Sequence, residues 1–296
     1  MSHTPFYTAM TSAPTTLPLP PLSNGLRLTW DNFVPLRHAH PQETHVIWPS
    51  QLSQNQLFWS SSKRLLEHLV TSQAPTFTLA YMDPPFASKA NYIRRLRFYV
   101  RDRWVKLPIQ EYSDHWNDSD YLQFIYEHLT LIHALLAPNG SIVVHCDWHQ
   151  NHHIRLLLDQ VFGRSQFQNE LIFAYGAGGQ PKHKFPRKHD TLLWYCKGQT
   201  PKFNSSVPEV RVPYDPSTLK SHYTNKDNDG RLYRRQRKNG QDYITYADQG
   251  KLVTSVWGDL KAQLATSPIS QDSTGYPTQK PEALLKRVIG ALSDEG

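Results

Sequence analysis

The sequence predicts an α/β fold, with a sheet between layers of helices, and two features of its hydrophobic pattern support this. Short runs rich in β-branched and aromatic residues, such as 76–82 and 141–146, alternate with longer segments such as 120–137, where apolar residues recur at helical spacing. Proline or glycine stands at the ends of several of these segments and limits them. Alternation of this kind is typical of a sheet covered by helices.

The expected elements follow a segment at residues 1–25 that is rich in proline, serine and threonine, which we expect to be a flexible tail. Apolar runs and helical periodicity then predict each element in turn. In chain order these are a strand at 57–59, a helix at 63–70, a strand at 76–82, a helix at 120–137 closed by Pro138-Asn139-Gly140, a strand at 141–146, a helix at 151–162 ended by Gly163, strands at 170–175 and 191–195, and a helix at 280–292 introduced by Pro281.

The composition changes at residues 199–250, which are polar, basic and interrupted by four prolines. We therefore expect a core formed by residues 26–198 and 251–296, interrupted by a small recognition insert at 199–250. Residues 231–240 of this insert read RLYRRQRKNG, a basic run that contains a tyrosine.

The overall composition limits the class of protein. The formal net charge of +7 suits a polyanionic partner, although charge alone does not separate DNA, RNA and acidic membranes. No stretch approaches the roughly 18 apolar residues that a membrane span needs, and no apolar leader opens the chain, so a soluble cytoplasmic protein without membrane contact is expected. Cys146 and Cys196 lie within apolar runs and are expected to be buried thiols rather than a disulfide.

The strand at 76–82 is followed by Asp83-Pro84-Pro85-Phe86, which we call the DPPF motif. Open α/β sheets bind ligands at the carboxyl ends of their strands, where this motif is expected to lie. The Asp83 carboxylate and the Pro84 carbonyl can accept both hydrogens of an exocyclic amine, while Phe86 can stack on the ring of a flipped-out base. Because Asp-Pro is common in turns, an ordinary strand-end turn is the alternative.

The chemistry of a base amine is compatible with this set of groups. Its lone pair is delocalised, so it is a poor nucleophile, and two acceptors favour the more pyramidal nitrogen that can attack a methyl sulfonium. A strong general base is then unnecessary.

Four blocks occur in a fixed order along the chain: 81–86 (YMDPPF), 140–149 with 154–159, 169–179 with 184–190, and 274–282 (TGYPTQKPE). In this order they resemble the beta-class DNA amino-methyltransferases, in particular the adenine-specific methylase subunits of type III-like restriction-modification systems. The resemblance covers roughly residues 77–198 and 255–296. It implies a Rossmann-like S-adenosylmethionine-dependent methyltransferase fold.

The resemblance also implies roles for individual residues. Asp83, Pro84, Pro85 and Phe86 would be the catalytic residues that hold the base. Asp83, together with Thr278, Gln279 and Lys280, would contribute to the S-adenosylmethionine pocket. Aspartate rather than serine at the first position of the motif favours adenine over cytosine.

The chain departs from the family pattern at two places. The family's Asp-x-Phe-x-Gly-x-Gly cofactor loop is expected within a few residues of Gly296, so the fold is expected to be incomplete in this chain. Residues 173–179 (FAYGAGG) imitate that loop but lack its acidic residue. Upstream, Trp59-Ser60-Ser61 stands where relatives usually carry Gly-Asp. We therefore expect either a second polypeptide that supplies the missing block, or a truncated relic.

Clusters of cations are the predicted DNA contacts, because lysine and arginine bind phosphates. Arg94, Arg97 and Arg101 would share one face if residues 88–103 are helical. Solvated surface charge is the alternative for these clusters. The residues predicted to bind DNA are Arg94, Arg97, Lys184, Arg187, Lys188, Arg231, Arg234, Arg235 and Arg237.

A zinc site is a competing interpretation of residues 145–153 (HCDWHQNHH), in which His149 and His153 have the i, i+4 spacing of helical ligands. The run crosses a predicted strand-to-helix junction, so alternate side chains point apart. No metal is therefore predicted.

The sequence thus predicts a site-specific DNA methyltransferase that moves a methyl group from S-adenosylmethionine to the 6-amino group of a flipped-out adenine in double-stranded DNA. A restriction subunit is a further expected partner. Two alternatives stay open: a catalytically silent DNA-binding subunit or relic of such an enzyme, and an RNA amino-methyltransferase.

Overall fold

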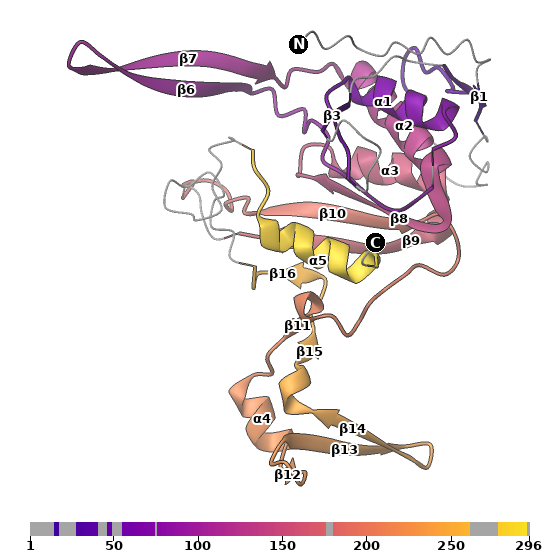
Figure 1. Ribbon diagram of the computed structural model, residues 1–296, viewed down its shortest axis with the longest axis vertical. Helices are drawn as coiled ribbons and strands as arrows, with labels where there is room; N and C mark the ends of the chain where they lie inside the picture. Colours follow the sequence, from indigo (N-terminus) through magenta and orange to yellow (C-terminus); the bar gives the residue numbers. More distant parts are fainter. Residues whose placement is uncertain are drawn as a thin grey trace, which may run out of the picture. The chain divides into compact units, whose positions relative to one another are not determined.

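The structure is a computed structural model of the chain and describes residues 15–17, 28–40, 46–48, 55–74, 76–175, 180–260 and 278–294. Figure 1 shows their helices and strands coloured along the sequence, and they divide into two compact units. Unit 1 comprises the described residues up to Glu170 together with Asp190–Pro201. Unit 2 comprises those of Leu171–His189 and from Lys202 onward.

Unit 1 contains a mixed sheet and three helices. Strand β5 (Phe77–Met82) pairs in parallel with β8 (Leu136–Cys146), which pairs antiparallel with β10 (His189–Cys196). The helices are α1 (Ser62–Thr71), α2 (Asp118–Leu135) and α3 (Asn151–Phe162), and a short 3₁₀ helix, η1 (Arg164–Gln166), follows α3. The predicted α/β class is confirmed.

Local signals explain where these helices begin and end. Asn117 caps α2 by accepting a hydrogen bond from the Asp120 N–H at 2.8 Å, and aspartates in the first turn complement the helix dipole. Helix α3 ends at Gly163, whose φ of 94° is a conformation that L side chains rarely adopt. The predicted bounds of α3, 151–162, are confirmed.

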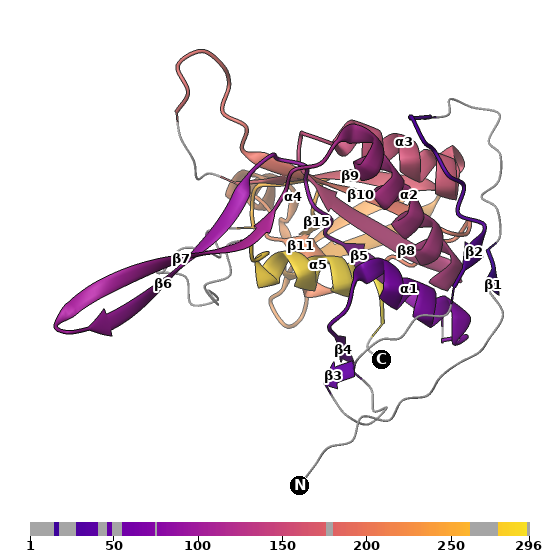
Figure 2. The same cartoon turned by 90° about the horizontal axis from the view of Figure 1, so that it is seen from above.

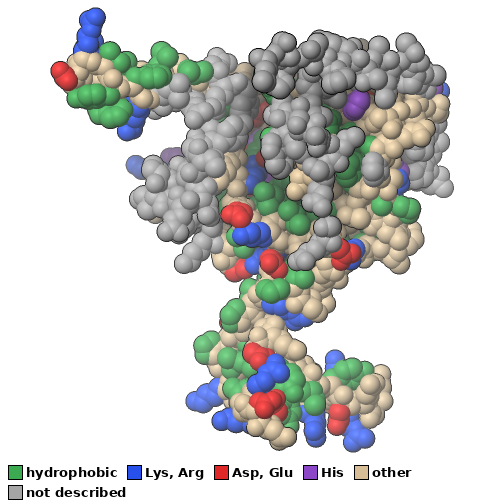
Figure 3. All heavy atoms as spheres, in the orientation of Figure 1, with side chains coloured by type: hydrophobic (Ala, Val, Ile, Leu, Met, Phe, Trp, Pro, Cys, Tyr) green, Lys and Arg blue, Asp and Glu red, His purple; other side chains and the backbone are tan. Residues whose placement is uncertain are grey.

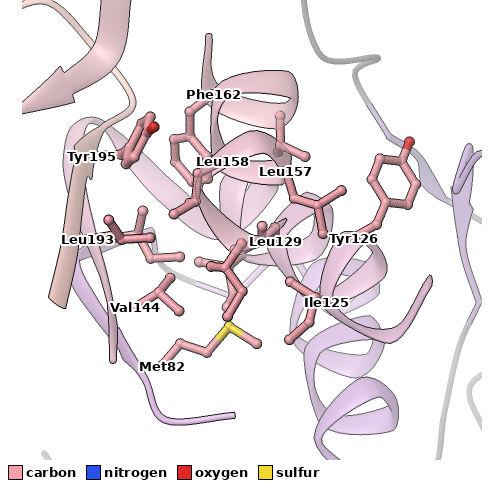
Figure 4. Close-up of a cluster of buried hydrophobic side chains, with 14 of the residues drawn as sticks. Met82, Ile125, Tyr126, Leu129, Val144, Leu157, Leu158, Phe162, Leu193 and Tyr195 are labelled. Carbon is pink, nitrogen blue, oxygen red and sulfur yellow. The ribbon is translucent and has the colours of Figure 1, made fainter. Parts of the chain in front are cut away.

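The core of unit 1 lies between the sheet and helices α2 and α3 (Figure 4). Ile125 and Leu129 from α2 meet Leu157 and Leu158 from α3, and all four are fully buried. Val144 of β8 joins them from the sheet. The hydrophobic period read from residues 120–137 therefore identifies the buried face of α2.

One predicted boundary is wrong. The helix expected at 120–137 ends at Leu135, and β8 begins at Leu136, so Pro138, Asn139 and Gly140 lie within the strand rather than in a separate turn. The irregular register between Phe77 and Leu79, opposite this segment, accommodates the proline, which donates no ladder hydrogen bond.

The flexible tail predicted at residues 1–25 stays a prediction, and the structure describes only a short part of this segment. Residues 1–14 and 18–25 lie outside the described residues. Strand β1 (Thr15–Thr16), however, pairs antiparallel with β2 (His38–Ala39). Leu17 is only 3% exposed and packs with Ala39 and Leu131, so burial of one apolar side chain fixes this part of the segment. Strands β3 (Val46–Trp48) and β4 (Leu57–Phe58) form a second antiparallel pair.

The helix considered for residues 88–103 is wrong. Strands β6 (Asn91–Val100) and β7 (Arg103–Ser113) form a two-stranded antiparallel sheet of their own, drawn as a long ribbon in Figures 1 and 2. Arg101 and Asp102 join them with φ values of 47° and 59°, the signs that a two-residue hairpin turn of type I′ requires. Aromatic and β-branched residues in both strands favour this pairing over a helix.

Unit 2 combines a parallel strand pair, a helix and small sheets. The end of β9 (Phe167–Ala174) pairs with β16 (Val256–Trp257), and α5 (Glu282–Leu292) follows Pro281 as predicted. Arg287 of α5 is buried and binds Asp259 through two nitrogens, at 3.0 and 2.5 Å. The remaining elements are η2 (Pro208–Val210), β11 (Arg211–Val212), α4 (Pro216–His222), β12 (Asn225–Lys226), β13 (Leu232–Lys238), β14 (Gln241–Tyr246), η3 (Ala247–Gln249) and β15 (Lys251–Leu252).

Residues 202–250 of the predicted insert lie in unit 2 together with 251–260 and 278–294. Their separation as a recognition region stays a prediction. Gly176, Gly178 and Gly179 of the loop-like run at 173–179, and residues 274–277 of the last family block, lie outside the described residues. Within the described ranges, no helix has both the length and the apolar character needed to cross a bilayer.

Candidate functional site

The DPPF motif begins immediately after β5, at the carboxyl end of that strand. Met82 is the last paired residue and lies opposite Val144 of the parallel strand β8. The Asp83 side chain is exposed, Pro84 is buried and Phe86 is half-buried. The motif therefore lies at the strand end where open α/β folds bind ligands, as predicted, and presents a carboxylate and part of an aromatic ring.

A tyrosine in α2 holds the middle of the motif. The Tyr121 hydroxyl donates a 2.8 Å hydrogen bond to the Pro85 carbonyl. Burial, with smaller contributions from Cys146, Asp114 and Asp147, raises the pKa of Tyr121 above its ordinary value, so the hydroxyl stays protonated and remains a donor. The Pro85 carbonyl is thereby fixed to the first turns of α2.

A buried carboxylate holds the residues that follow the motif. Asp114 is 2% exposed and accepts hydrogen bonds from the Ala87 N–H at 3.2 Å and from the Ser88 N–H at 2.8 Å. The Ser88 hydroxyl donates a third, at 2.7 Å. Ala87 has a φ of 53°, which is unfavourable for a residue with a side chain. The Asp114 contacts stabilise this turn and with it the position of Phe86.

A buried chain of polar groups lies beneath the motif. His145 of β8 is fully buried, with Nδ1 2.6 Å from the Tyr81 hydroxyl and Nε2 3.1 Å from the Asp190 carboxylate. Asp190 accepts only from a protonated Nε2, so the neutral tautomer that fits carries its proton there and Nδ1 accepts from Tyr81. Burial, reinforced by Asp83 and Asp190, raises the pKa of Tyr81 and keeps it protonated as this donor.

His145 also connects this chain of groups to the motif. The rings of Phe86 and His145 have centroids 5.9 Å apart and are tilted by 34°. One side of the Phe86 ring is thus supported by the imidazole, and the ring keeps partial exposure for a further planar group. Sequence reasoning placed Tyr81 and His145 in family blocks but assigned them no role at the site.

The histidine-rich run that raised the zinc alternative is used in local hydrogen bonds. His149 Nδ1 lies 2.7 Å from the Asp147 carboxylate, and His153 Nδ1 lies 2.8 Å from the Gln150 side chain. Burial raises the pKa of the Cys146 thiol, which disfavours the thiolate that binds metals. Among the described residues, no group of three or more histidines, cysteines and carboxylates could hold a metal ion.

The predicted cofactor residues outside the motif belong to unit 2. Thr278, Gln279 and Lys280 are half-buried and precede Pro281, the residue before α5. Asp83 belongs to unit 1, so the shared cofactor pocket stays a prediction.

The predicted DNA-binding residues are distributed over both units. Arg94 and Arg97 lie in β6 of unit 1, whereas Lys184, Arg187 and Lys188 lie in unit 2, in the loop between β9 and β10. The Tyr175 N–H donates to the Lys188 carbonyl at 2.9 Å. This contact closes the end of the loop, and the side chains of Lys184 and Arg187 are exposed.

The cations of residues 231–238 have different surroundings. Arg231 binds Asp248 through two nitrogens, at 2.7 and 2.9 Å, and its guanidinium lies 4.1 Å from the Tyr246 ring centroid. Arg234 is half-buried, while Arg235 is exposed and 4.0 Å from Asp242. Arg237 is exposed. The contacts of Arg231 lie within its own subdomain, so Arg235 and Arg237 are the more accessible of these predicted DNA contacts.

Comparison with known proteins gives one family match. The family model described as "DNA methylase" matches residues 77–296, which include β5, the DPPF motif and every element after it. The match covers the elements that form the site described above.

Similar proteins include methyltransferases of restriction-modification systems. The chain is 25% identical to Type II methyltransferase M.EcaI of Enterobacter cloacae, over 86% of this chain and 62% of that protein. It is 24% identical to the Type III restriction-modification enzyme StyLTI Mod subunit of Salmonella typhimurium, over 86% of this chain and 48% of that protein. The chain thus spans about half to three fifths of the length of these relatives.

Among solved structures, the crystal structure of an M1.HpyAVI-SAM complex aligns with a TM-score of 0.40 and 14% sequence identity. The alignment covers 79% of this chain and 75% of that one.

Proposed function

Because the chain belongs to the DNA methylase family, we propose that it transfers a methyl group from S-adenosylmethionine to the 6-amino group of adenine in duplex DNA. The observation that carries this proposal is the DPPF motif at the carboxyl end of β5, with an exposed Asp83 and a partly exposed Phe86. Relatives named as a type II methyltransferase and a type III Mod subunit support the same reaction class.

The motif performs the reaction by holding the base amine. The Asp83 carboxylate and the Pro84 carbonyl accept its two hydrogens and direct the nitrogen lone pair toward the methyl donor. Phe86 stacks on the flipped-out base, and the imidazole of His145 supports the Phe86 ring. Positive charge develops on the nitrogen during attack, and the Asp83 carboxylate stabilises it until the nitrogen releases one proton to water.

The residues present fit S-adenosylmethionine, which supplies the methyl group when bound. Asp83 is an exposed carboxylate at a strand end, suited to a cationic ligand, and Thr278, Gln279 and Lys280 provide a hydroxyl, an amide and an ammonium group. We propose that these four residues contribute to the pocket. Duplex DNA is the proposed substrate and a restriction subunit a proposed partner, in line with the Mod subunits among the relatives. A second polypeptide that supplies a cofactor loop stays a prediction from the family resemblance.

The reaction can be tested in a bacterial host that lacks adenine methylation. Expression of the full chain, alone or together with a polypeptide that supplies the expected cofactor loop, is expected to produce N6-methyladenine at one sequence motif in the host DNA, detected by nucleoside mass spectrometry and long-read sequencing. N4-methylcytosine instead would overturn the choice of adenine. Methyl groups confined to RNA would favour the RNA alternative, and DNA binding without any methylation would favour the silent subunit.

Asp114 is expected to act as a positioning residue for this reaction. Replacing Asp114 with alanine leaves the Ala87 and Ser88 N–H groups without their acceptor, which costs about 1–3 kcal/mol for each unsatisfied buried group. We expect kcat to fall about tenfold or more, because the motif loses its fixed geometry. Asp114→Asn keeps one acceptor oxygen and should recover part of the rate. A positioning role would be contradicted if both variants lost the same amount of stability while the kcat of the folded protein stayed unchanged.

A further inference from the structure

Strands β6 and β7 form a ribbon whose two faces differ. Opposite residues in an antiparallel pair point to the same face, and successive residues alternate between faces. The register sets Arg97 opposite Lys106 and Tyr99 opposite Trp104. These four side chains therefore share one face, which we call the basic-aromatic face.

The basic-aromatic face is open to solvent. Tyr99 is 60% exposed and Trp104 is 67% exposed, with ring centroids 5.3 Å apart, while Arg97 and Lys106 are also exposed. Figure 3 shows hydrophobic side chains along the ribbon and lysine or arginine side chains toward its end. Two exposed aromatic rings beside two cations are costly to maintain in water and indicate a surface that meets a partner.

The opposite face is mostly apolar. Phe98 lies opposite Val105, and Leu107 and Ile109 follow at the same alternation, each at least 39% exposed. This face also carries the aromatic ring of Phe98 itself and, near the turn, Arg103, which lies opposite Val100. Across residues 97–109 there are four cations (Arg97, Arg101, Arg103 and Lys106) against one acid, Asp102, which lies in the turn. The net positive charge favours an anionic partner over a second copy of this basic chain.

We propose that the basic-aromatic face is a DNA-binding ribbon that contacts duplex DNA beside the target base. Arg97 and Lys106 neutralise phosphates, and Tyr99 and Trp104 pack on sugars and exposed base surfaces. A two-stranded ribbon has the width that the major groove of B-DNA admits. This inference rests on the proposed function for the identity of the substrate. It replaces the helical face expected for Arg94, Arg97 and Arg101.

The base of the ribbon is tied directly to the DPPF motif. The ladder that ends with Asn91 opposite Ser113 continues as the Asp114 N–H donates to the Ala90 carbonyl at 2.9 Å and the Lys89 N–H donates to the Asp114 carbonyl at 3.0 Å. The carboxylate of the same Asp114 holds Ala87 and Ser88. DNA bound along the ribbon is thereby connected through one buried residue to the turn that positions Phe86.

The test compares two variants of the full chain that remove the same amount of charge. The ribbon variant combines Arg97→Gln with Lys106→Gln. The control combines Arg64→Gln with Arg164→Gln, two exposed cations of unit 1 that lie in α1 and η1. Binding to a fluorescein-labelled duplex of mixed sequence is measured by anisotropy at several salt concentrations. Val105→Thr tests the apolar face.

The ribbon variant is expected to bind duplex DNA about tenfold more weakly, and the slope of log K against log salt should fall by about 1 for each phosphate that the protein no longer neutralises. The control and Val105→Thr should bind like the unmodified chain.

Equal affinity and slope in the ribbon variant and the control would overturn the inference, and so would a loss confined to Val105→Thr. These outcomes are separate from the proposed function. If the unmodified chain methylates adenine and the ribbon variant binds DNA normally, only the inference about the ribbon is refuted. If the unmodified chain fails to methylate adenine and the ribbon variant binds DNA weakly, only the proposed reaction is refuted.

Discussion

Replacing Asp83 with alanine is expected to lower methyl transfer about 10²- to 10³-fold while DNA binding and stability stay close to those of the unmodified chain. The carboxylate is proposed to accept an amine hydrogen and to stabilise the charge that develops on the nitrogen, and loss of one such preorganised group has a cost of this size. Because the side chain is exposed at the end of β5, its removal creates no cavity in the core.

The measurement is kcat at saturating S-adenosylmethionine and DNA, with the thermal midpoint recorded for each variant. Asp31→Ala removes another exposed aspartate of unit 1 and should leave kcat unchanged. Asp83→Asn keeps acceptor capacity but loses the charge, and its rate should lie between those of the unmodified chain and Asp83→Ala. A rate for Asp83→Ala within about threefold of the unmodified chain, far short of the expected loss, would refute the proposed role of the carboxylate.

Local sequence patterns predicted most of the secondary structure because hydrophobic periodicity and the effects of glycine and proline act within a few residues. The bounds of α3 match the prediction because its apolar residues end at Phe162 and the next residue, Gly163, has the positive φ that ends a helix. The strand at 77–82 ends where Asp83-Pro84 begins, because proline removes a ladder donor. The DPPF motif was therefore placed correctly at a strand end before any tertiary contact was known.

The β6–β7 ribbon shows where such patterns fail. Arg94, Arg97 and Arg101 have the spacing of one helical face, but spacing of a few cations says little about backbone conformation. The run of aromatic and β-branched residues around them, Tyr92 to Val105, carries the stronger preference for paired strands. The turn that permits the pairing uses Arg101 and Asp102 at positive φ, and only aspartate of the two is common there.

The surroundings of the DPPF motif could not be predicted because each contact joins residues far apart in the chain. Tyr121 reaches Pro85 only when α2 packs beside β5, and His145 reaches Asp190 through the pairing of β8 with β10. Neither contact has a local sequence signal. Asp114 is similar, because its partners are set by the register of the ribbon. These contacts explain why a short exposed motif keeps one geometry.

Replacing Leu157 with alanine is expected to lower the free energy of unfolding of unit 1 by about 2–5 kcal/mol. The side chain is fully buried in the core between α3, α2 and the sheet, so its loss removes apolar burial and leaves a cavity. Packing between α2 and α3 also fixes Tyr121, so a loosened core should weaken the support of Pro85 and reduce methyl transfer near the unfolding midpoint.

Leu156→Ala provides the matched control, since Leu156 is the adjacent leucine of α3 and is only half-buried. The same chemical change should there cost about 1 kcal/mol, because less apolar surface returns to water and the neighbouring space stays open to solvent. Urea unfolding of both variants gives the comparison through the shift in midpoint at constant slope. Equal midpoint shifts for the two variants would mean that α3 does not bury the face that contains Leu157. The inference that packing of α3 against α2 helps to hold the motif would then be refuted.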